Sequence, residues 1–470
     1  MFQAVITPEM RGGLGMHYTS VPNIKKVIKP LFLDELYEYF EENKNKPKQL
    51  NDLLFRLSKI KIFDPACGSG NFLIIAYKEL RKLEIKIIKQ LQVLKDSVSG
   101  FEPFQKELIP TSQQNLAASF QVELFSRIQL TQFYGIEIDD FAHEVATLAL
   151  WLAEHQMNVE FFREFGSTNP TLPLNEAGHI FHGNACRLDW ENICPKNKSD
   201  EVYILGNPPY LGARLQNKNQ KSDMKYVFGS IKGFNNLDYI SCWFLKGSDY
   251  INNSKSKYAF VTTNSISQGE QVSILWPNIF AYNLEIIFTY KPFKWTNSAK
   301  GNAGVTVTII GISQTTTNDK VIINKELKHY VKTINPYLVE GISTIIEKRS
   351  KPISILPEMC FGSMPNDGGN LIFQSEDEYI NTLRKFPGIE KYTRVMYGGQ
   401  DFLRGVKRYC FWINDNDIKD ALNFDFIKDR INKVREYRKL SKREATTNLA
   451  SIPYKFGEVR HQETDLIVIP

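Results

Sequence analysis

The sequence KIFDPACGSGNF, residues 61–72, predicts a short buried strand, a tight glycine turn and the start of a helix. Gly68 and Gly70 lack a Cβ, so the backbone of this turn can approach a bound molecule closely. In α/β folds such turns lie at the carboxyl edge of the sheet, where cofactors bind. Asp64, at the end of the strand, suits a positively charged ligand better than a pyrophosphate. An ordinary strand-to-helix turn remains the alternative for this pattern taken alone.

Two better-known phosphate loops do not fit these residues. No Gly-Lys-Ser or Gly-Lys-Thr follows the glycines, which excludes a Walker phosphate loop. The third glycine of a dinucleotide-binding fingerprint is also missing. The sequence therefore predicts a cofactor turn of another class.

Strand-like and helix-like segments alternate along the first two-thirds of the chain. Several expected strands are continuous apolar runs, which is typical of buried parallel strands. Such alternation predicts an α/β fold with a doubly wound, Rossmann-like sheet. We expect strands at residues 61–63, 132–138, 202–205, 258–262, 284–290 and 305–312, and helices at residues 72–94, 141–157 and 239–251. Residues 98–131 are expected to form a helical insertion between the first two strands.

Composition narrows the class of protein. The 470 residues are 42% apolar and 23% charged, which excludes disordered, collagen-like and disulfide-scaffold proteins. Six scattered cysteines without a Cys-x-x-Cys pair argue against a structural zinc cluster, so we expect no metal. No apolar run is long enough to span a bilayer, and we expect a soluble protein without a membrane partner. A net charge of +6 is compatible with a polyanion partner but does not establish one.

The texture of the sequence changes after about residue 335, where turn-forming residues multiply and the strands become short. We therefore expect two domains, residues 1–340 and residues 341–470, the second of mixed α+β structure. Its basic helical run, residues 430–443, is either a solvated face or a contact with phosphates.

A second acidic residue, Glu137, follows the expected strand at residues 132–138. A carboxylate at the end of the second strand usually holds the hydroxyls of a nucleoside ribose. Glu137 lies much farther from the glycine turn than the typical ~20 positions. The insertion at residues 98–131 accounts for the excess without moving the strand.

The tetrapeptide Asn207-Pro208-Pro209-Tyr210 ends another apolar strand. Two consecutive prolines fix φ and remove both backbone donors, which leaves their carbonyls outward in a rigid loop. Such a loop can grasp a planar amine: one hydrogen goes to the Asn207 side chain and the other to the Pro208 carbonyl. Tyr210 offers a face on which an extruded base can stack, a contact of roughly 1–3 kcal/mol. A plain Pro-Pro turn is the alternative.

Together, the glycine turn and this tetrapeptide resemble motifs I and IV of S-adenosylmethionine-dependent adenine-N6 DNA methyltransferases. The order of the motifs is similar to the gamma group and to the Type IIG and IIL restriction–modification enzymes. The resemblance implies that the cofactor is S-adenosylmethionine. It also implies that Asp64 and the glycines hold its methionine end and that Glu137 binds its ribose.

The resemblance extends to further residues. The segment Gly15–Ser20 is similar to a cofactor motif upstream of motif I, although a polar helix cap is the alternative. Residues 183–190 resemble the motif after the third strand, and residues 291–301 the stretch whose aromatic ring covers the other face of the target base. Of Phe293 and Trp295 we favour Phe293. The implied cofactor-binding residues are Tyr18, Thr19, Asp64, Pro65, Ala66, Gly68, Gly70, Asn71, Phe72, Glu137, Ile138, Asn184 and Asn207, and the implied catalytic residues are Asn207, Pro208, Pro209, Tyr210 and Phe293.

In the second domain, residues 362–369 and 407–413 resemble the Type IIL target-recognition region. The family also carries a nuclease domain and a helical spacer, which this sequence does not show before residue 15. We therefore expect a fragment or split gene product without cleavage activity, whose recognition region is incomplete. A separate chain that supplies the missing parts is a further expected partner.

The predicted function is methyl transfer from S-adenosylmethionine to the N6 amine of a flipped adenine in double-stranded DNA, in the cytoplasm of a bacterium. Cytosine-N4 methylation uses the same grip on an amine and stays open. Glutamine methylation of release factors uses a similar loop, in shorter enzymes without the upstream motif. A catalytically silent DNA-binding fragment is the alternative from another class. Carbon-5 cytosine chemistry is rejected because it needs a Pro-Cys nucleophile, and Cys194-Pro195 has the opposite order.

Overall fold

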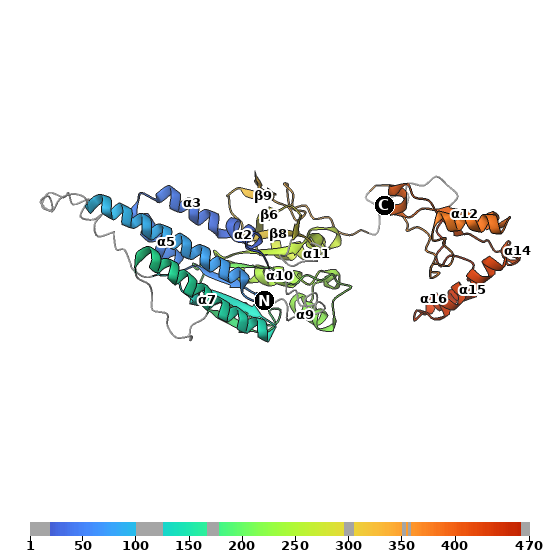
Figure 1. Ribbon diagram of the computed structural model, residues 1–470, viewed down its shortest axis with the longest axis horizontal. Helices are drawn as coiled ribbons and strands as arrows, with labels where there is room; N and C mark the ends of the chain where they lie inside the picture. Colours follow the sequence, from blue (N-terminus) through green and yellow to red (C-terminus); the bar gives the residue numbers. More distant parts are fainter. Residues whose placement is uncertain are drawn as a thin grey trace. The chain divides into compact units, whose positions relative to one another are not determined.

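The computed structural model describes residues 19–99, 126–166, 178–295, 305–349, 354–355 and 359–461. The chain divides into two compact units, Met1–Lys348 and Arg349–Pro470, called here the N-terminal and C-terminal units (Figure 1). None of the described helices is both long and apolar enough to cross a membrane.

A ten-stranded sheet forms the centre of the N-terminal unit, in the order β10-β9-β6-β8-β5-β4-β1-β2-β3, with β7 paired to β8. The five strands from β5 to β3 run parallel, whereas β8 lies antiparallel between β5 and β6. The strands are β1 (Lys61–Asp64), β2 (Phe133–Glu137), β3 (His179–His182), β4 (Val202–Gly206), β5 (Lys257–Thr263), β6 (Leu284–Tyr290), β7 (Phe293–Trp295), β8 (Val305–Gln314), β9 (Lys320–Asn324) and β10 (Leu327–Val331).

Helices cover both faces of this sheet (Figure 1). Neighbouring residues of a strand point to opposite faces, so Ile62 packs into one apolar core and Phe63 into the other. The first core joins the sheet to α2 (Val21–Ile28), η2 (Lys29–Leu33), α3 (Asp34–Asn43), α4 (Pro47–Leu57), α5 (Asn71–Ser99) and α7 (Asp140–Phe165). The second joins it to α8 (Trp190–Ile193), α9 (Lys218–Phe228), α10 (Ser241–Ile251) and α11 (Gly269–Phe280). The predicted doubly wound fold is confirmed.

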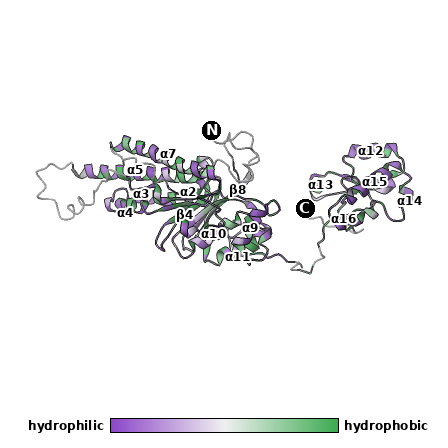
Figure 2. Cartoon of the chain, turned by 90° about the horizontal axis from the view of Figure 1, so that it is seen from below, coloured by the Kyte–Doolittle hydropathy of each residue, from purple (hydrophilic) through white to green (hydrophobic). Residues whose placement is uncertain are grey.

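Single-turn helices link several of these elements: η4 (Leu130–Gln132), η5 (Phe234–Asn236) and η6 (Asn264–Ser267). The helices mix hydrophilic and hydrophobic residues along their length (Figure 2), as expected for helices with one face toward a sheet.

All six expected strands are present, and β6 has the predicted bounds. The expectations missed β7, β9 and β10, and they gave no bounds for the helices within residues 21–57 or for β3, although residues 183–190 were expected to follow a third strand. No bounds were predicted for β3 because it is an edge strand whose residues are mostly exposed, so it has no apolar run. Of the expected insertion, residues 98–99 belong to α5, while residues 100–125 lie outside the described part of the chain.

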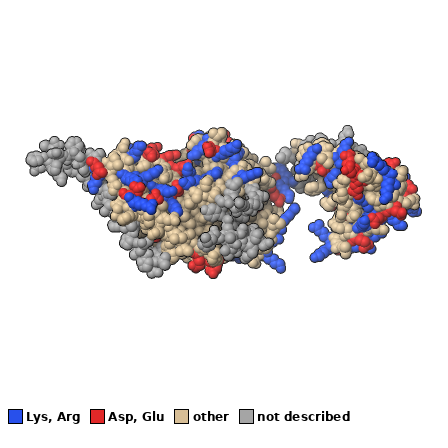
Figure 3. Space-filling view, viewed as in Figure 1, with Lys and Arg blue, Asp and Glu red and all other residues tan. Residues whose placement is uncertain are grey.

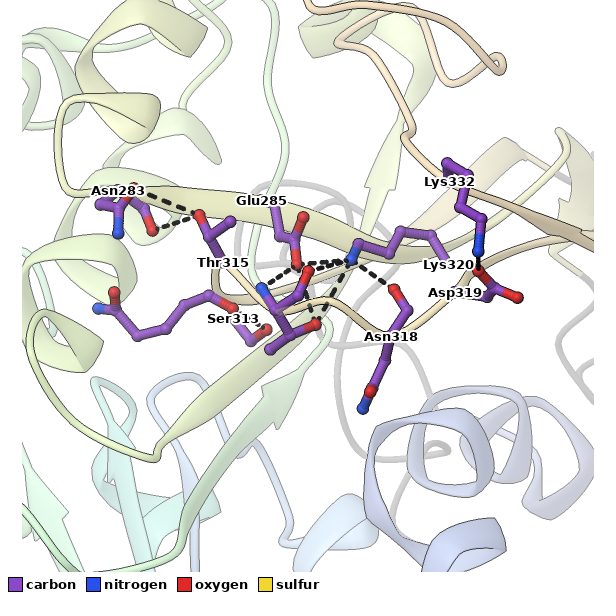
Figure 4. Close-up of polar contacts among 10 residues, drawn as sticks. Asn283, Glu285, Ser313, Thr315, Asn318, Asp319, Lys320 and Lys332 are labelled. Carbon is purple, nitrogen blue, oxygen red and sulfur yellow. Dashed lines mark hydrogen bonds and ion pairs between the residues drawn. The ribbon is translucent and has the colours of Figure 1, made fainter.

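A buried lysine fastens the turn between β8 and β9 (Figure 4). The Nζ atom of Lys320 donates to the carbonyl oxygens of Thr316 at 2.8 Å and Asn318 at 2.6 Å, and it lies 2.8 Å from the Glu285 carboxylate. Glu285 in turn accepts a hydrogen bond from the Thr316 backbone N–H. This network ties the end of β8 to β6 and β9, far along the sheet from the glycine turn.

The C-terminal unit has mixed α+β structure, as expected, around a small core of its own. An antiparallel pair, β11 (Thr393–Met396) and β12 (Arg408–Phe411), lies against helices. The helices are α12 (Glu376–Lys385), η7 (Ile389–Tyr392), α13 (Gly399–Arg404), α14 (Ile418–Ala421), α15 (Asp425–Lys439), α16 (Glu444–Asn448) and η8 (Leu449–Ser451).

The basic run of α15 is not uniformly a DNA-facing surface, which corrects part of the sequence interpretation. Arg438 is fully buried, and its guanidinium donates to five backbone carbonyl oxygens at 2.7–3.0 Å. Arg430 pairs with Glu378 and donates to two more carbonyls. A helix that packs on one side must turn some of its residues inward, so these two arginines stabilise the unit's interior.

Candidate active site

Three parallel strands bring the predicted site residues to one edge of the sheet. The strands β2 and β4 flank β1, with Asp64 opposite Gly135 and Phe63 opposite Ile204. The carboxyl ends of parallel strands meet at the same edge, which is where α/β folds bind ligands. The loops that begin at Asp64, Glu137 and Gly206 therefore start side by side.

Asp64 is fully buried at the end of β1. Its Oδ1 atom accepts a hydrogen bond from the Ala66 N–H at 3.0 Å, while Oδ2 has no hydrogen-bond partner within the described residues. Burial, with a smaller contribution from the nearby Glu137 charge, raises the pKa of the Asp64 carboxyl to about 8. A buried acid with an unused oxygen is suited to a positively charged group, which would restore its ionised form.

Gly206 links this acid to the tetrapeptide. A Cβ atom at Gly206 would lie only 2.5 Å from Asp64 Oδ1, so no larger residue fits without moving the carboxylate. The glycine thus lets the end of β4 pass directly beside Asp64 and places Asn207 next to the glycine turn.

Glu137 fixes the glycine turn through its backbone. One carboxylate oxygen accepts from the Gly68 N–H at 2.8 Å, and the other accepts from the Ile138 and Asp139 N–H groups at 2.9 and 2.8 Å. Burial raises the pKa of Glu137, against the effect of these hydrogen bonds. Because a carboxylate can accept about four hydrogen bonds, room is left for a ribose hydroxyl, and that role stays a prediction.

The remaining predicted cofactor residues surround this turn in different ways. Ile138 is 55% exposed and offers a flat apolar surface beside Glu137. Phe72 is buried in the core, and Asn71 donates to Ser69 Oγ at 3.1 Å. The carbonyl oxygen of Pro65 accepts a hydrogen bond from the indole N–H of Trp243 at 3.1 Å, which fastens the turn to α10.

The upstream motif is only partly described. Tyr18 lies outside the described residues, whereas Thr19 is buried. The alternative of a side-chain cap does not hold for Ser20, which sits at the start of α2 without such a hydrogen bond. In the described part of the chain no hydrogen bond joins Thr19 to the other predicted residues.

Asn184 follows β3 and is held by a buried carboxylate. Its Nδ2 atom donates to Asp223 Oδ2 at 3.0 Å, and its side-chain Oδ1 atom accepts from the Cys186 N–H at 2.9 Å. Asp223 also accepts from Arg187 Nε at 2.7 Å and from the Tyr239 hydroxyl at 2.8 Å. The predicted role of Asn184 in cofactor binding stays a prediction.

The Asn207 side chain carries a second unpaired acceptor. Its Oδ1 atom is buried and has no hydrogen-bond partner in the described structure. A buried acceptor without a partner costs free energy, so a ligand that donates a hydrogen bond to this atom would be favoured. Tyr210, at the end of the tetrapeptide, is partly buried and packs against both cores.

The two candidate aromatics on β7 differ in exposure. Trp295 is buried, whereas Phe293 is only partly buried against the first core, with its ring 5.9 Å from that of Trp295. Lys26 Nζ lies 5.6 Å from the Phe293 ring centre. Phe293 is therefore the ring with a face to offer, although its contact with a base stays a prediction.

Sequence reasoning missed two acidic residues that organise these loops, Asp223 and Asp238. Asp238 is buried and accepts from the Leu211 N–H at 2.7 Å, directly after the tetrapeptide. The available signal was a charged residue between Leu237 and Tyr239, since a charge among apolar residues needs partners. The described residues contain no cluster of three His, Cys, Asp or Glu side chains that could hold a metal ion.

Comparison with known proteins agrees with this geometry. Residues 40–324 match the model of the MmeI DNA-methyltransferase domain. The chain belongs to this family. Residues 340–470 match the MmeI target recognition domain, so both MmeI domains are represented, and the predicted resemblance to Type II restriction–modification methyltransferases is confirmed.

Two MmeI-like relatives show how far the likeness extends. DNA methyltransferase A of Bacillus subtilis (strain 168) is 46% identical over an alignment of 472 positions, which covers all of this chain and 51% of that protein. The structure of the Type IIL restriction–modification enzyme MmeI in complex with DNA is 38% identical, with a TM-score of 0.81, over 98% of this chain and 60% of that one. The chain thus spans about half the length of the curated relative.

Proposed function

We propose that the chain transfers a methyl group from S-adenosylmethionine to the N6 amine of an adenine flipped out of double-stranded DNA, as the modification component of a restriction–modification system. The observation that carries the proposal is the buried, unpaired Oδ1 atom of Asn207, which directly follows Gly206 beside the fully buried Asp64 at the end of the neighbouring strand. The family match supports the same reaction type.

Asn207 and Pro208 act on the amine. The Asn207 carbonyl oxygen accepts one amine hydrogen, and the backbone carbonyl of Pro208 accepts the other. Both hydrogen bonds draw the nitrogen lone pair out of conjugation with the ring, which makes the nitrogen nucleophilic. The proton leaves during or after transfer, so no strong general base is required. Tyr210 and Phe293 hold the two faces of the base and offset the cost of flipping, which is a few kcal/mol.

The glycine turn and its acids fit S-adenosylmethionine, which when bound supplies an electrophilic methyl group on a positively charged sulfur. Asp64 Oδ2 is an unused acceptor for the positive methionine end, and the backbone at Gly68 and Gly70 allows close approach. Glu137 keeps room for the ribose, and exposed Ile138 covers one face of the adenine. Thr19 and Tyr18 belong to the methionine end in the same proposal.

The domains divide the work. Residues 1–340 form the methyltransferase domain, and residues 341–470 recognise the DNA target. Lys and Arg side chains lie among Asp and Glu on the face of the C-terminal unit seen in Figure 3, so phosphate contacts are expected from selected exposed residues and not from a uniform basic surface. A bacterial cytoplasm, where DNA and S-adenosylmethionine meet, is the matching location.

Incubation with labelled S-adenosylmethionine and DNA of mixed sequence tests the proposal. The products are digested to nucleosides, and parallel samples are read by modification-sensitive sequencing. We expect label in N6-methyladenine at one short recurring sequence. Label in N4-methylcytosine would replace the adenine assignment, and absence of label from DNA at saturating cofactor would refute methyl transfer by this chain.

A further inference from the structure

Two buried aspartates each hold one loop of the site by hydrogen bonds. Asp238 contacts the loop that follows the tetrapeptide, and Asp223 contacts the loop after β3. Each is almost fully buried, each lies within the N-terminal unit, and each accepts three side-chain or backbone hydrogen bonds. A buried carboxylate is rare unless it is fully paired, so both have a definite task in this fold.

Asp238 joins the tetrapeptide loop to the end of β5. Its Oδ1 atom accepts from the Leu211 N–H at 2.7 Å and from the Ile240 N–H at 3.3 Å. Its Oδ2 atom accepts from Ser265 Oγ at 3.1 Å. Leu211 follows Tyr210 directly, so this carboxylate sets where the tetrapeptide ends.

The other backbone group of Leu211 is held from the same segment. Its carbonyl oxygen accepts from the Tyr239 N–H at 3.0 Å, and also from Gln216 Nε2 at 3.0 Å. Both polar backbone atoms of the residue next to Tyr210 are thereby fixed from the residues around Asp238. Hydrogen bonds at Leu211 thus fix the C-terminal end of the loop that carries the amine-binding groups, while β4 fixes its N-terminal end.

Asp223 holds the loop after β3 in the same way as Asp238 holds the tetrapeptide loop. Its contacts with Asn184, Arg187 and the Tyr239 hydroxyl hold the loop after β3, whose Asn184 is one of the predicted cofactor-binding residues. Tyr239 therefore touches both sides: its backbone N–H holds Leu211, and its hydroxyl holds Asp223. The two aspartates form one network that meets at this tyrosine.

We propose that Asp238 is a positioning residue for the target amine and that Asp223 is its counterpart for the cofactor. The inference rests on the proposed function, because it assumes that Asn207 binds the amine. Asp238 keeps Asn207, Pro208 and Tyr210 at the geometry needed for transfer, and it acts only through the loop. Small displacements of positioned groups are enough to slow a reaction about 100-fold.

The test separates the two carboxylates by kinetics on the full chain, with cofactor concentration varied at saturating DNA. Asp238→Ala is expected to lower kcat about 10- to 100-fold while the cofactor KM stays near that of the wild type. Asp223→Ala is expected to do the reverse, with a raised cofactor KM and a nearly unchanged kcat. Titration calorimetry with S-adenosylmethionine alone checks the second effect without DNA.

Two further variants guard against a purely structural explanation. The Asp238→Asn side chain keeps an oxygen that can accept from the Leu211 and Ile240 N–H groups, and its amide can donate to Ser265 Oγ. Asp238→Asn should therefore recover most of the kcat that Asp238→Ala loses. Tyr239→Phe removes the bond to Asp223 but keeps the backbone bond to Leu211, so it should resemble a mild Asp223 variant. Circular dichroism and thermal melting compare folding among the four variants.

The outcomes are distinct. An inactive wild type would refute the proposed function. The calorimetric affinity for S-adenosylmethionine would then test the role of Asp223 without any activity measurement. An active wild type with Asp238→Ala at full kcat would overturn the positioning role of Asp238. Equal losses in kcat and cofactor affinity for both alanine variants would show that the aspartates only stabilise the fold, and would likewise overturn it.

Discussion

Two regions of the molecule, one in each unit, treat their buried polar groups in opposite ways. In the N-terminal unit, Asp64 and Asn207 each keep a buried oxygen without a partner at the edge of the sheet. In the C-terminal unit, all five donors of buried Arg438 are used on backbone carbonyls. The difference separates a site, which leaves hydrogen-bonding capacity for a ligand, from an interior support, which leaves none.

Unpaired atoms alone do not mark a site. The N-terminal unit also leaves the Asn264 Oδ1 unpaired, in η6 directly after β5. Asn207 is distinguished by its position between the cofactor turn and two rigid prolines. The following predictions test whether this distinction holds, from the largest expected effect to the smallest.

The largest effect is expected for Asn207→Ala. Loss of the acceptor for the target amine should lower the methyl-transfer rate on the order of 10²- to 10³-fold, the size seen when one transition-state hydrogen bond is removed. Affinity for S-adenosylmethionine, measured by calorimetry, should not change. Asn264→Ala is the matched control, because it removes an equally unpaired amide one strand away, and it should retain activity close to that of the wild type.

Wild-type rates in Asn207→Ala would break the proposed mechanism. Equal losses in the two asparagine variants would show that the unpaired amides at this edge act alike, and that the tetrapeptide has no special role.

A second large effect concerns stability. Arg438→Met removes the group that joins Pro365 and Asn366 to residues 449–455, and it leaves five carbonyls without this partner. We expect the C-terminal unit to lose about 3 kcal/mol or more of unfolding free energy, measured by hydrogen exchange within that unit. Arg435→Met is the control on the same helix, since the one hydrogen bond found for the Arg435 side chain among the described residues is to Asn432. It should change stability by less than about 0.5 kcal/mol.

The two arginine variants would behave alike if α15 were simply a solvated basic helix. In that case the contrast between a saturated interior and an open site would lose its support in the C-terminal unit.

A moderate effect is expected from pH, through Asp64. Its pKa of about 8 lies above the ordinary value of 3.8, so the carboxyl is mostly protonated at pH 6.5 and must ionise to pair with a cationic ligand. Cofactor binding should therefore release a proton at pH 6.5, and affinity should rise by up to about tenfold per pH unit until pH 8. Calorimetry in two buffers of different ionisation enthalpy measures the released proton.

The same shift fixes the sign of the stability effect. Because the folded pKa is raised, this carboxyl favours folding most below pH 3.8, and its contribution is lost as pH rises to about 8. Asp64→Asn should remove both the proton release and this pH dependence. Proton release that persists unchanged in Asp64→Asn would place the titrating group elsewhere, with Glu137 the next candidate.

The smallest effect is expected at the end of the basic run. Lys442 and Arg443 are exposed, unlike Arg430 and Arg438. Changing both to Ala should weaken DNA binding several-fold and reduce the slope of log affinity against log salt by about 1 for each lost phosphate contact. An unchanged salt slope would remove this segment, which lies between α15 and α16, from the DNA interface.

Local sequence patterns were sufficient for the parts of the site that lie on one strand and its loop. An apolar run that is followed by Asp64 or Asn207 and then by glycine or proline is compatible with few structures other than a buried strand ending in a tight loop. Gly206 could be understood only from the structure, because its need for a bare Cα comes from Asp64, far away in the sequence. Asp223 and Asp238 were missed for the same reason, since their partners lie on other loops.

In the C-terminal unit, the sequence predicted the basic helix but not which of its arginines are buried. The run from Arg430 to Arg443 predicts a basic helix, and α15 includes residues 430–439 of it, whereas residues 440–443 lie between α15 and α16. Its charge pattern could not tell which arginines face inward, because that depends on loops at residues 365–366 and 449–455 that fold against it. Burial of a fully hydrogen-bonded arginine is a tertiary property.

The central claim is that the unpaired oxygen of Asn207 receives a hydrogen from the target amine. Once sequencing has identified the methylated site, the adenine can be replaced by purine, which lacks the amine. DNA affinity is then measured for wild type and Asn207→Ala with both DNAs, as a double-mutant cycle that cancels differences in base flipping. We predict a coupling of about 1 kcal/mol or more, with loss of the amine costing less in Asn207→Ala, where only the hydrogen bond to the Pro208 carbonyl remains to be lost. Fully additive effects would contradict the claim.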